Sequence, residues 1–134
     1  MKLLLAVFFA LLMPAAAMAA NMDAPAIDAA KAWLALVDAD DYAQSWNAAS
    51  QFLQSHVTEA QWESVGKAAR DPLGAVVGRG VASVKFSATL AGAPDGQYAL
   101  VEFDTQFAHK AAATESVVLT MEGGVWKTAG YFIK

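Results

Sequence analysis

Two acidic side chains, Glu102 and Asp104, offer the plainest chemistry in the sequence, because they alternate with apolar residues and so share one face of a predicted strand. Paired carboxylates act as general acid and general base when burial separates their pKa values. Lys85 is expected opposite Glu102 on the preceding strand, where a solvated ion pair is the simpler role. An enzyme using Glu102 and Asp104 is therefore the least favoured of three functional hypotheses, and we expect no catalysis.

The histidines and the closely spaced aspartates do not form a metal-binding pattern. His56 and His109 are the only histidines, and neither has a partner at metal-ligand spacing. Asp38, Asp40 and Asp41 lack the glycine and the terminal glutamate of a calcium-binding loop. We expect helix capping from these aspartates, and neither a metal site nor a bound cofactor.

Two arginines and the helical tryptophans are the candidates for ligand binding. Arg70 and Arg79 flank a connection containing proline and glycine, and such a pair could hold an anionic group through forked hydrogen bonds. Structural pairing with Asp71 or with a carbonyl at a helix end is the more ordinary role. Tryptophans at helical spacing usually pack in the core. The alternative is a candidate pocket made of Trp46, Trp62, Arg70 and Arg79.

The chain begins with the features of an export signal. Met1 and Lys2 precede an apolar run over residues 3–13, and residues 17–19, Ala-Met-Ala, match a peptidase site. The run is shorter than the roughly 20 residues that span a bilayer. We expect cleavage after residue 19, a mature chain beginning at Ala20, and a periplasmic location, with secretion as the alternative. The chain has no cysteine to accept a lipid anchor.

Composition limits the partners of the mature chain. Of the 134 residues, the 19 of the leader leave 115, which form one domain over residues 20–134. The net charge of -4 becomes -5 without Lys2, and an acidic domain disfavours nucleic acid and anionic lipid. The absence of cysteine excludes disulfides and thiol chemistry.

Apolar residues at spacings of three and four predict three helices in the first half, over about residues 25–37, 42–55 and 59–70. Asp23 and Pro25 favour the start of the first helix. Asp40 or Asp41 favours the start of the second, and Thr58 to Gln61 has capping-box spacing for the third. Asp71-Pro72 ends that helix.

Alternation of apolar and polar residues then predicts four antiparallel strands, over residues 82–90, 98–107, 114–121 and 125–133. Phe86 is expected opposite Val101, and Gly123-Gly124 is expected to form a hairpin turn. Helices followed by strands on one core indicate an α+β fold, with three N-terminal helices packed on one face of a four-stranded antiparallel meander.

The sheet face away from the helices is expected to carry an unusual apolar patch. Strict alternation places Phe132 with Val117 on the helix side and its neighbours on the other. The candidate interaction residues on that outer face are Tyr98, Leu100, Tyr131 and Ile133. Such a patch suggests a partner or a second copy.

Aromatic and turn residues recur in a recognisable order: Trp33-Leu34, Val37-Asp38, Tyr42, Ser45-Trp46, Trp62, Arg70, Pro72-Leu73-Gly74, Arg79, Pro94-Asp95-Gly96, Trp126 and Gly130-Tyr131-Phe132-Ile133. From about Ala29 to Ile133 this pattern resembles DUF4019, an exported bacterial family of unknown function. The layout is also similar to cystatin-like and nuclear-transport-factor-like rolls, in which the space between helices and sheet often holds a ligand.

These features together predict an exported, non-catalytic binding or interaction module. The first hypothesis is protein interaction through the outer sheet face, with an envelope protein or a second copy as partner. The second is a small-molecule carrier that uses the space between helices and sheet.

Overall fold

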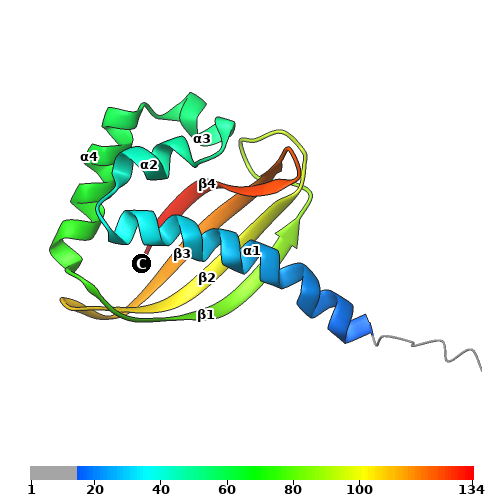
Figure 1. Cartoon of the computed structure of the whole chain (residues 1–134), viewed down its shortest axis with the longest axis horizontal. Helices are drawn as coiled ribbons and strands as arrows, with labels where there is room; N and C mark the ends of the chain where they lie inside the picture. The colour runs from blue at the N-terminus through cyan, green and yellow to red at the C-terminus, as the bar shows by residue number, and fades with distance from the viewer. Residues whose placement is uncertain (1–14) are drawn as a thin grey trace, which may run out of the picture.

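The computed structural model describes residues 15–134, with side chains described from residue 22. Its elements are α1 (Ala15–Asp38), α2 (Tyr42–Asn47), α3 (Gln51–His56), α4 (Glu59–Arg70), a 3₁₀ turn η1 (Asp71–Leu73), β1 (Val76–Ser87), β2 (Tyr98–Phe107), β3 (Lys110–Glu122) and β4 (Val125–Ile133). The strands form one antiparallel sheet in the order β1-β2-β3-β4. Figure 1 shows α1 lying across one face of this sheet, with α2, α3 and α4 grouped near its C-terminal end. The predicted α+β fold is confirmed.

The first helix begins earlier than the sequence indicated. α1 starts at Ala15 and passes through Pro25, so the predicted start at Asp23–Pro25 is wrong. A proline removes one intrahelical donor, and the alanine-rich sequence around it favours helix strongly enough to continue. The predicted cleavage point after residue 19 falls inside α1, while the leader residues 1–14 lie outside the described residues. No helix in the described part of the chain is long and apolar enough to cross a membrane.

The predicted second helix is two helices, α2 and α3, separated at Ser50. The Ser50 side chain caps α3 by accepting a hydrogen bond of 3.1 Å from the Leu53 amide. Its own amide donates to the Thr128 carbonyl of β4 at 2.8 Å. This hydrogen bond to the sheet holds a turn at Ser50 that divides the predicted second helix. The structure therefore has four helices where the sequence predicted three. The predicted capping box of Thr58 and Gln61 is confirmed at the start of α4.

The pairing of β1 with β2 keeps the predicted faces but shifts the register by two residues. Phe86 pairs with Ala99, and Val84 pairs with Val101. The predicted pairing of Lys85 with Glu102 is therefore wrong, because Lys85 pairs with Leu100. The shift arises because β1 ends before the predicted last residue and a longer loop, residues 88–97, connects the strands.

Two β-bulges reverse which side chains face the helices. On β1, Arg79 pairs with Thr105 and Val84 with Val101, so one extra residue lies between them, where Ala82 interrupts the pairing. The bulge turns Arg79 to the inner face, the one that the helices cover.

The second bulge lies on β4 at Ala129, between Thr128, which pairs with Leu119, and Gly130, which pairs with Val118. Tyr131 consequently pairs with Val117 and faces the helices, whereas Phe132 faces away and is 60% exposed. The predicted outward orientation of Tyr131 and inward orientation of Phe132 are wrong, because the extra residue inverts the alternation.

The core lies between α1 and the inner face of the sheet and is built around two tryptophans. The Trp33 and Trp62 rings are 5.5 Å apart, and their indole N–H groups donate to the backbone oxygen and the side-chain oxygen of Ser45, at 2.9 and 2.8 Å. Trp46 is half-buried against the same core. Core packing, the ordinary role expected for the helical tryptophans, is therefore what the structure shows.

Candidate functional site

Charged and polar side chains meet where the C-terminal ends of α1 and α4 approach the inner face of the sheet. We call them the inner cluster; its members are Asp38, Arg70, Arg79, Thr105, Glu115 and Tyr131. They come from α1, α4 and all four strands. The cluster therefore joins every layer of the fold at one end of the sheet.

Local structure explains the direction of four side chains in the inner cluster. Asp38 is the last residue of α1, and Arg70 is the last residue of α4, because Asp71 and Pro72 begin the 3₁₀ turn. The bulge on β1 turns Arg79 inward, and the bulge on β4 does the same for Tyr131. With strict alternation in both strands, Arg79 and Tyr131 would face away from the helices and would not belong to the cluster.

Glu115 is the centre of the inner cluster and is 0% exposed. Its carboxylate accepts hydrogen bonds from Arg79 Nε at 2.7 Å and from Thr105 Oγ1 at 2.6 Å. The Tyr131 hydroxyl donates to the other carboxylate oxygen. A buried carboxylate is tolerated only when it is paired and hydrogen-bonded, and Glu115 meets both conditions.

Both arginines of the chain donate hydrogen bonds to Asp38. Arg79 donates to its two oxygens at 2.8 and 3.0 Å in a forked pair, and Arg70 Nη2 donates at 2.8 Å. Burial alone would raise the pKa of Asp38, but the hydrogen bonds and charges of Arg79 and Arg70 outweigh it and hold this pKa below its ordinary value. Asp38 therefore stays ionised over a wide pH range.

The Tyr131 phenol is held in its neutral form. Burial is the largest cause that raises the pKa of Tyr131, and the charge of Glu115 and the hydrogen bond to it raise this pKa further. Arg70 lies close to the phenol, and its positive charge and its hydrogen bonding oppose the shift without cancelling it. Tyr131 is therefore a hydrogen-bond donor to Glu115 far above neutral pH.

Arg70 is the member of the inner cluster with buried nitrogens that lack a hydrogen-bond partner among the described residues. Its Nε and Nη1 groups are buried and have no hydrogen-bond partner among the described residues, although Arg70 is only 7% exposed. The Phe107 ring lies 5.1 Å from the guanidinium carbon and covers its face, but a ring face does not satisfy donors at the guanidinium edge.

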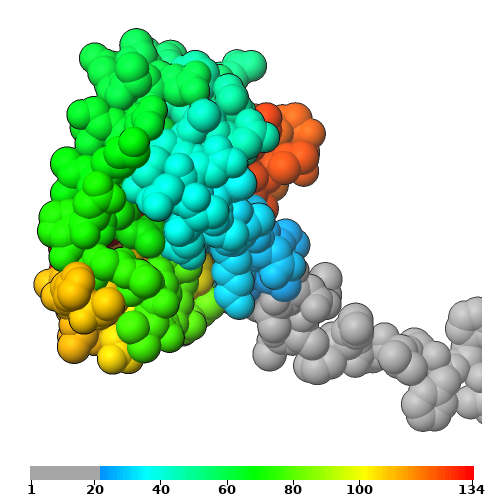
Figure 2. All heavy atoms as spheres, turned by 60° about the vertical axis from the view of Figure 1, so that its left-hand side comes forward, coloured from blue at the N-terminus to red at the C-terminus, as the bar shows by residue number. Residues whose placement is uncertain are grey.

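A pocket of about 530 Å³ lies beside Arg70. Its lining residues, which define the Arg70 pocket, are Asp38, Asp40, Arg70, Asp71, Gly74, Ala75 and Val76. Figure 2 shows this side of the molecule, where α4 in green, the start of β1 and the turn between β2 and β3 in orange come together. Three of the lining side chains are carboxylates and one is a cation, so the mouth of the pocket is acidic.

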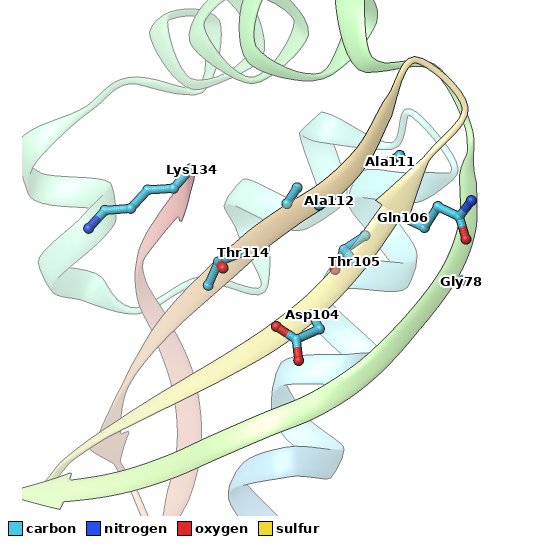
Figure 3. A pocket seen from close by; sticks show the side chains of 9 residues that line it. Gly78, Asp104, Thr105, Gln106, Ala111, Ala112, Thr114 and Lys134 are labelled. Atoms are coloured by element: carbon cyan, nitrogen blue, oxygen red, sulfur yellow. The ribbon is translucent and has the colours of Figure 1, made fainter.

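A second, more open pocket of about 640 Å³ lies at the same end of the sheet. Figure 3 shows Asp104 and Gln106 on β2, Thr114 on β3 and Lys134 at the end of the chain around it. Asp104 is exposed here, and Glu102 is half-exposed on the outer face beside Ser83. These two carboxylates are in solvated positions rather than in the dry cleft that acid and base catalysis would require.

The outer patch expected from the sequence is not assembled as predicted. Tyr98 is buried, with its hydroxyl donating to the Pro94 carbonyl of the neighbouring loop, and Leu100 is half-buried. Tyr131 faces the core, with its ring 5.3 Å from that of Trp33. Ile133 pairs with Glu115 and so shares its side of the sheet. The inclusion of Tyr131 and Ile133 in an outer patch is therefore wrong.

Of the four candidate pocket residues, the structure brings two together. Arg70 and Arg79 meet on Asp38, not on Asp71 as the sequence suggested for Arg70. Trp62 packs on Trp33, and the Trp46 indole donates to the Val57 carbonyl at 2.9 Å. Neither tryptophan lines the Arg70 pocket.

Sequence reasoning missed Glu115 and the role of Thr105. A signal was present, because Glu115 shares the alternation of Val117 and Leu119 on β3, whose side chains face the core. A carboxylate at an inward position needs a buried cation, and the chain offers only two arginines. His56 and His109 take no part in the cluster, and within residues 22–134 no group of three or more acidic or histidine side chains is placed to hold a metal ion.

The fold and the inner cluster define a small α+β protein with a polar pocket between its helices and one end of its sheet. The chain belongs to the family described as protein of unknown function (DUF4019), whose model matches residues 29–131. The match includes every residue of the inner cluster and confirms the resemblance seen in the sequence. No curated protein matches the chain.

Proposed function

We propose that this protein is an exported, non-catalytic module that binds a small polar ligand in the Arg70 pocket. The observation that carries the proposal is the pair of unpartnered donors, Nε and Nη1, on a buried arginine beside a pocket of about 530 Å³. The proposed location is the periplasm, which rests on the leader pattern at residues 1–19.

The energetics of Arg70 favour a ligand that accepts hydrogen bonds. A buried donor without a partner costs about 1–3 kcal/mol, and more for a charged group. An oxygen that accepts from Nε or from Nη1 would recover that cost at one donor, because the two N–H groups lie on different edges of the guanidinium. Both nitrogens are shielded from solvent, so the acceptor reaches them with a shift of the Arg70 side chain or of residues 71–75.

The bonding of Glu115 supports binding over catalysis. Its carboxylate already accepts from Arg79, Thr105 and Tyr131, which engages most of its acceptor sites in holding the fold, and it is 0% exposed. A general base needs a free lone pair within reach of substrate. We assign Glu115 to the positioning of Arg79 rather than to proton transfer.

Native mass spectrometry of the protein purified from periplasmic extract tests the binding proposal. The expected result is a retained small molecule in the parent and its loss in Arg70→Met, in which Asp38 keeps its forked pair with Arg79. Lys67→Met is the matched control, because Lys67 lies on the same helix, is exposed and pairs with Glu63. Equal retention by parent and Arg70→Met, or no ligand on the parent, would contradict the proposal.

A second candidate function is protein interaction through a revised outer patch. Phe132 is 60% exposed, and its ring lies over Gly130 on the face that also carries Val118 and Leu100. Leu100→Lys with Phe132→Lys should leave the melting temperature unchanged and abolish any self-association measured by light scattering. If the parent is monomeric at high concentration, the patch does not bind a second copy of this chain.

A further inference from the structure

An apolar groove of about 220 Å³ lies between β4 and the helices α3 and α4, and it shares no lining residue with the Arg70 pocket. We call it the β4 groove. Its helical wall includes Phe52, Val57, Trp62 and Val65, and its other wall is residues 129–132 of β4. Val65 is 62% exposed, so apolar surface of this wall is open to solvent.

The side chains of the β4 groove offer a partner few free polar groups. The Trp62 indole N–H and the Tyr131 hydroxyl both donate to acceptors within the protein. His56 Nδ1 lies 2.7 Å from the Phe52 carbonyl oxygen, to which it donates. Hydrogen bonding in the groove therefore depends on the backbone of β4.

β4 is an edge strand of the sheet, and Figure 1 shows it beside α3. Lys134 and Thr114 exchange two hydrogen bonds, of 2.9 and 3.1 Å. Because hydrogen-bonded pairs alternate along an antiparallel ladder, Phe132 also bonds β3, whereas the N–H and C=O groups of Tyr131 and Ile133 point away from β3. These four groups have no hydrogen-bond partner in the part of the chain that the structure describes. They match the backbone of an extended peptide.

The open part of this edge is short. The Ser50 amide donates to the Thr128 carbonyl at 2.8 Å, so the start of α3 already covers the edge before the bulge at Ala129. An added strand would therefore pair with residues 130–134. Its residues opposite Tyr131 and Ile133 would share their inner face and pack against the helical wall, and the residues between would lie on the outer face.

The charges of the two edge strands argue against a second copy as the occupant. β1 and β4 are the edges of the sheet, and their charged residues are all cationic: Arg79 and Lys85 on β1, and Lys127 on β4, which Lys134 follows. Pairing β4 with either edge of a second copy would bring like charges onto neighbouring strands, which is destabilising. Lysine on an edge strand discourages such self-pairing.

The same lysines indicate the charge of a different partner. Lys127 and Lys134 pair with Thr120 and Thr114, which alternate with residues that face the helices, so both lysines lie on the outer face of β4. Figure 3 shows the Lys134 side chain extending away from β3. Neither lysine forms an ion pair with any residue that the structure describes. Acidic residues at the outer positions of an added strand would complement them.

We propose that the β4 groove binds an extended, acidic peptide segment of another protein as a fifth strand of the sheet. Main-chain hydrogen bonds to Tyr131 and Ile133 supply affinity, and alternate side chains supply specificity. Apolar residues face Trp62 and Val65, and acidic residues face the lysines. This site is separate from the Arg70 pocket and goes beyond the proposed function.

A matched set of peptides tests the inference by calorimetry. The probe is acetyl-Glu-Val-Tyr-Val-Glu-amide, which places valine opposite Tyr131 and Ile133 and glutamate at the outer ends. One control replaces both glutamates with lysine, and the other methylates both valine nitrogens. The probe should bind about tenfold tighter than either control, because methylation removes both donors to β4. Added salt should weaken the probe.

Variants assign the two halves of the recognition. Val65→Ser should weaken the probe, and Ala68→Ser is the matched control, because Ala68 is exposed on the same helix outside the groove. Lys127→Glu with Lys134→Glu should reverse the preference, so that the lysine peptide binds tighter than the probe. Arg70→Met should leave binding of the probe unchanged, since Arg70 does not line the groove.

Amide hydrogen exchange followed by NMR locates the contact. In the free protein the amides of Tyr131 and Ile133 should exchange faster than that of Phe132, which bonds β3. The probe should slow the first two amides. Unchanged exchange at Tyr131 and Ile133 in the presence of bound probe would overturn the assignment to this edge.

The remaining outcomes are equally decisive. Equal binding by the probe and its methylated form would overturn strand addition, and equal binding by the probe and the lysine peptide would overturn the acidic class. A parent that dimerises with slowed exchange at Tyr131 and Ile133 would assign the edge to a second copy. No binding by the probe would leave the lysines only the role of preventing self-pairing. None of these results bears on the Arg70 pocket, which native mass spectrometry tests separately.

Discussion

Arg79 and Asp38 join the edge strand β1 to the end of α1 through two parallel hydrogen bonds of 2.8 and 3.0 Å. The same guanidinium donates to Glu115 on β3 at 2.7 Å. Forked pairs of arginine and carboxylate constrain both distance and angle. This relationship therefore helps set the separation of helix and sheet at the end of the fold where the Arg70 pocket opens.

Truncating the central carboxylate should be strongly destabilising. Glu115→Ala leaves Arg79 Nε, Thr105 Oγ1 and the Tyr131 hydroxyl without their buried acceptor. Breaking a buried ion pair by removing one partner costs about 3–5 kcal/mol. Urea denaturation measures the loss, and Glu102→Ala on the outer face should change the free energy of unfolding by about 0.5 kcal/mol or less. Similar losses in the two variants would show that Glu115 is not the organising acceptor.

Acid should weaken the fold through Asp38. Its pKa is lowered in the folded state by Arg79 and Arg70 against the effect of burial, so its contribution to stability is complete above its unfolded pKa of about 4. That contribution is lost as pH falls through the lower folded pKa. The free energy of unfolding of Asp38→Asn should therefore be lower than that of the parent at pH 7, with the difference shrinking below pH about 4. A constant difference down to pH 2 would contradict the ion-pair assignment.

Alkaline titration should not detect Tyr131. Its pKa is raised by burial and then by Glu115, whereas an unperturbed phenol ionises near pH 10. The absorbance change of the folded parent near pH 10 to 11 should therefore equal that of Tyr131→Phe. A smaller amplitude in Tyr131→Phe over that range would mean that the phenol is accessible to solvent and does not donate to Glu115.

Local signals predicted much of the fold because their causes are local. The capping box of Thr58 and Gln61 and the positive φ angles of Gly123 and Gly124 each depend on a few neighbouring residues. Alternation identified β2 correctly, and its inner residues are buried. The α+β class followed from the order of these elements.

The candidate site was only partly predictable, because its contacts cross long stretches of chain. Arg70 and Arg79 were identified as a pair, but their shared partner Asp38 lies 32 and 41 residues away. The bulges at Ala82 and Ala129 were not predicted, because alanine fits either face of a strand; the nearby glycines Gly80 and Gly130 were the available local signs. A bulge inverts the side chains on one side of it relative to strict alternation, and that inversion moved Tyr131 from a predicted outer patch into the inner cluster.

Export processing should remove the first 19 residues. Residues 17–19 carry alanines at both positions that signal peptidases select, and the chain has no cysteine to carry a lipid. Intact mass and N-terminal sequencing of the protein recovered from the periplasm should therefore give a chain that begins at Ala20. A mass that includes Met1, or membrane association that survives a salt wash, would contradict this prediction.

Inserting one alanine between Gly130 and Tyr131 should invert the end of β4. The added residue would turn Phe132 to the core and Tyr131 to solvent, so Glu115 would lose a donor and Trp33 an aromatic contact. We expect a loss of about 3–5 kcal/mol in the free energy of unfolding, as for other disruptions of a buried ion-pair network. Inserting one alanine after Ala91, an exposed residue of the loop between β1 and β2, is the matched control and should be tolerated.

The rescue of that insertion is the decisive measurement, because an insertion that merely damages the strand also destabilises. Adding Tyr131→Phe and Phe132→Tyr to the insertion would restore a phenol on the inner face opposite Glu115. This combined variant should recover at least about 1 kcal/mol, the ordinary contribution of a buried hydrogen bond. The same exchange in the parent should instead destabilise, since it would remove the phenol from the inner cluster. If the exchange has the same sign in both backgrounds, the alternation that follows the bulge at Ala129 does not determine which aromatic residue reaches Glu115.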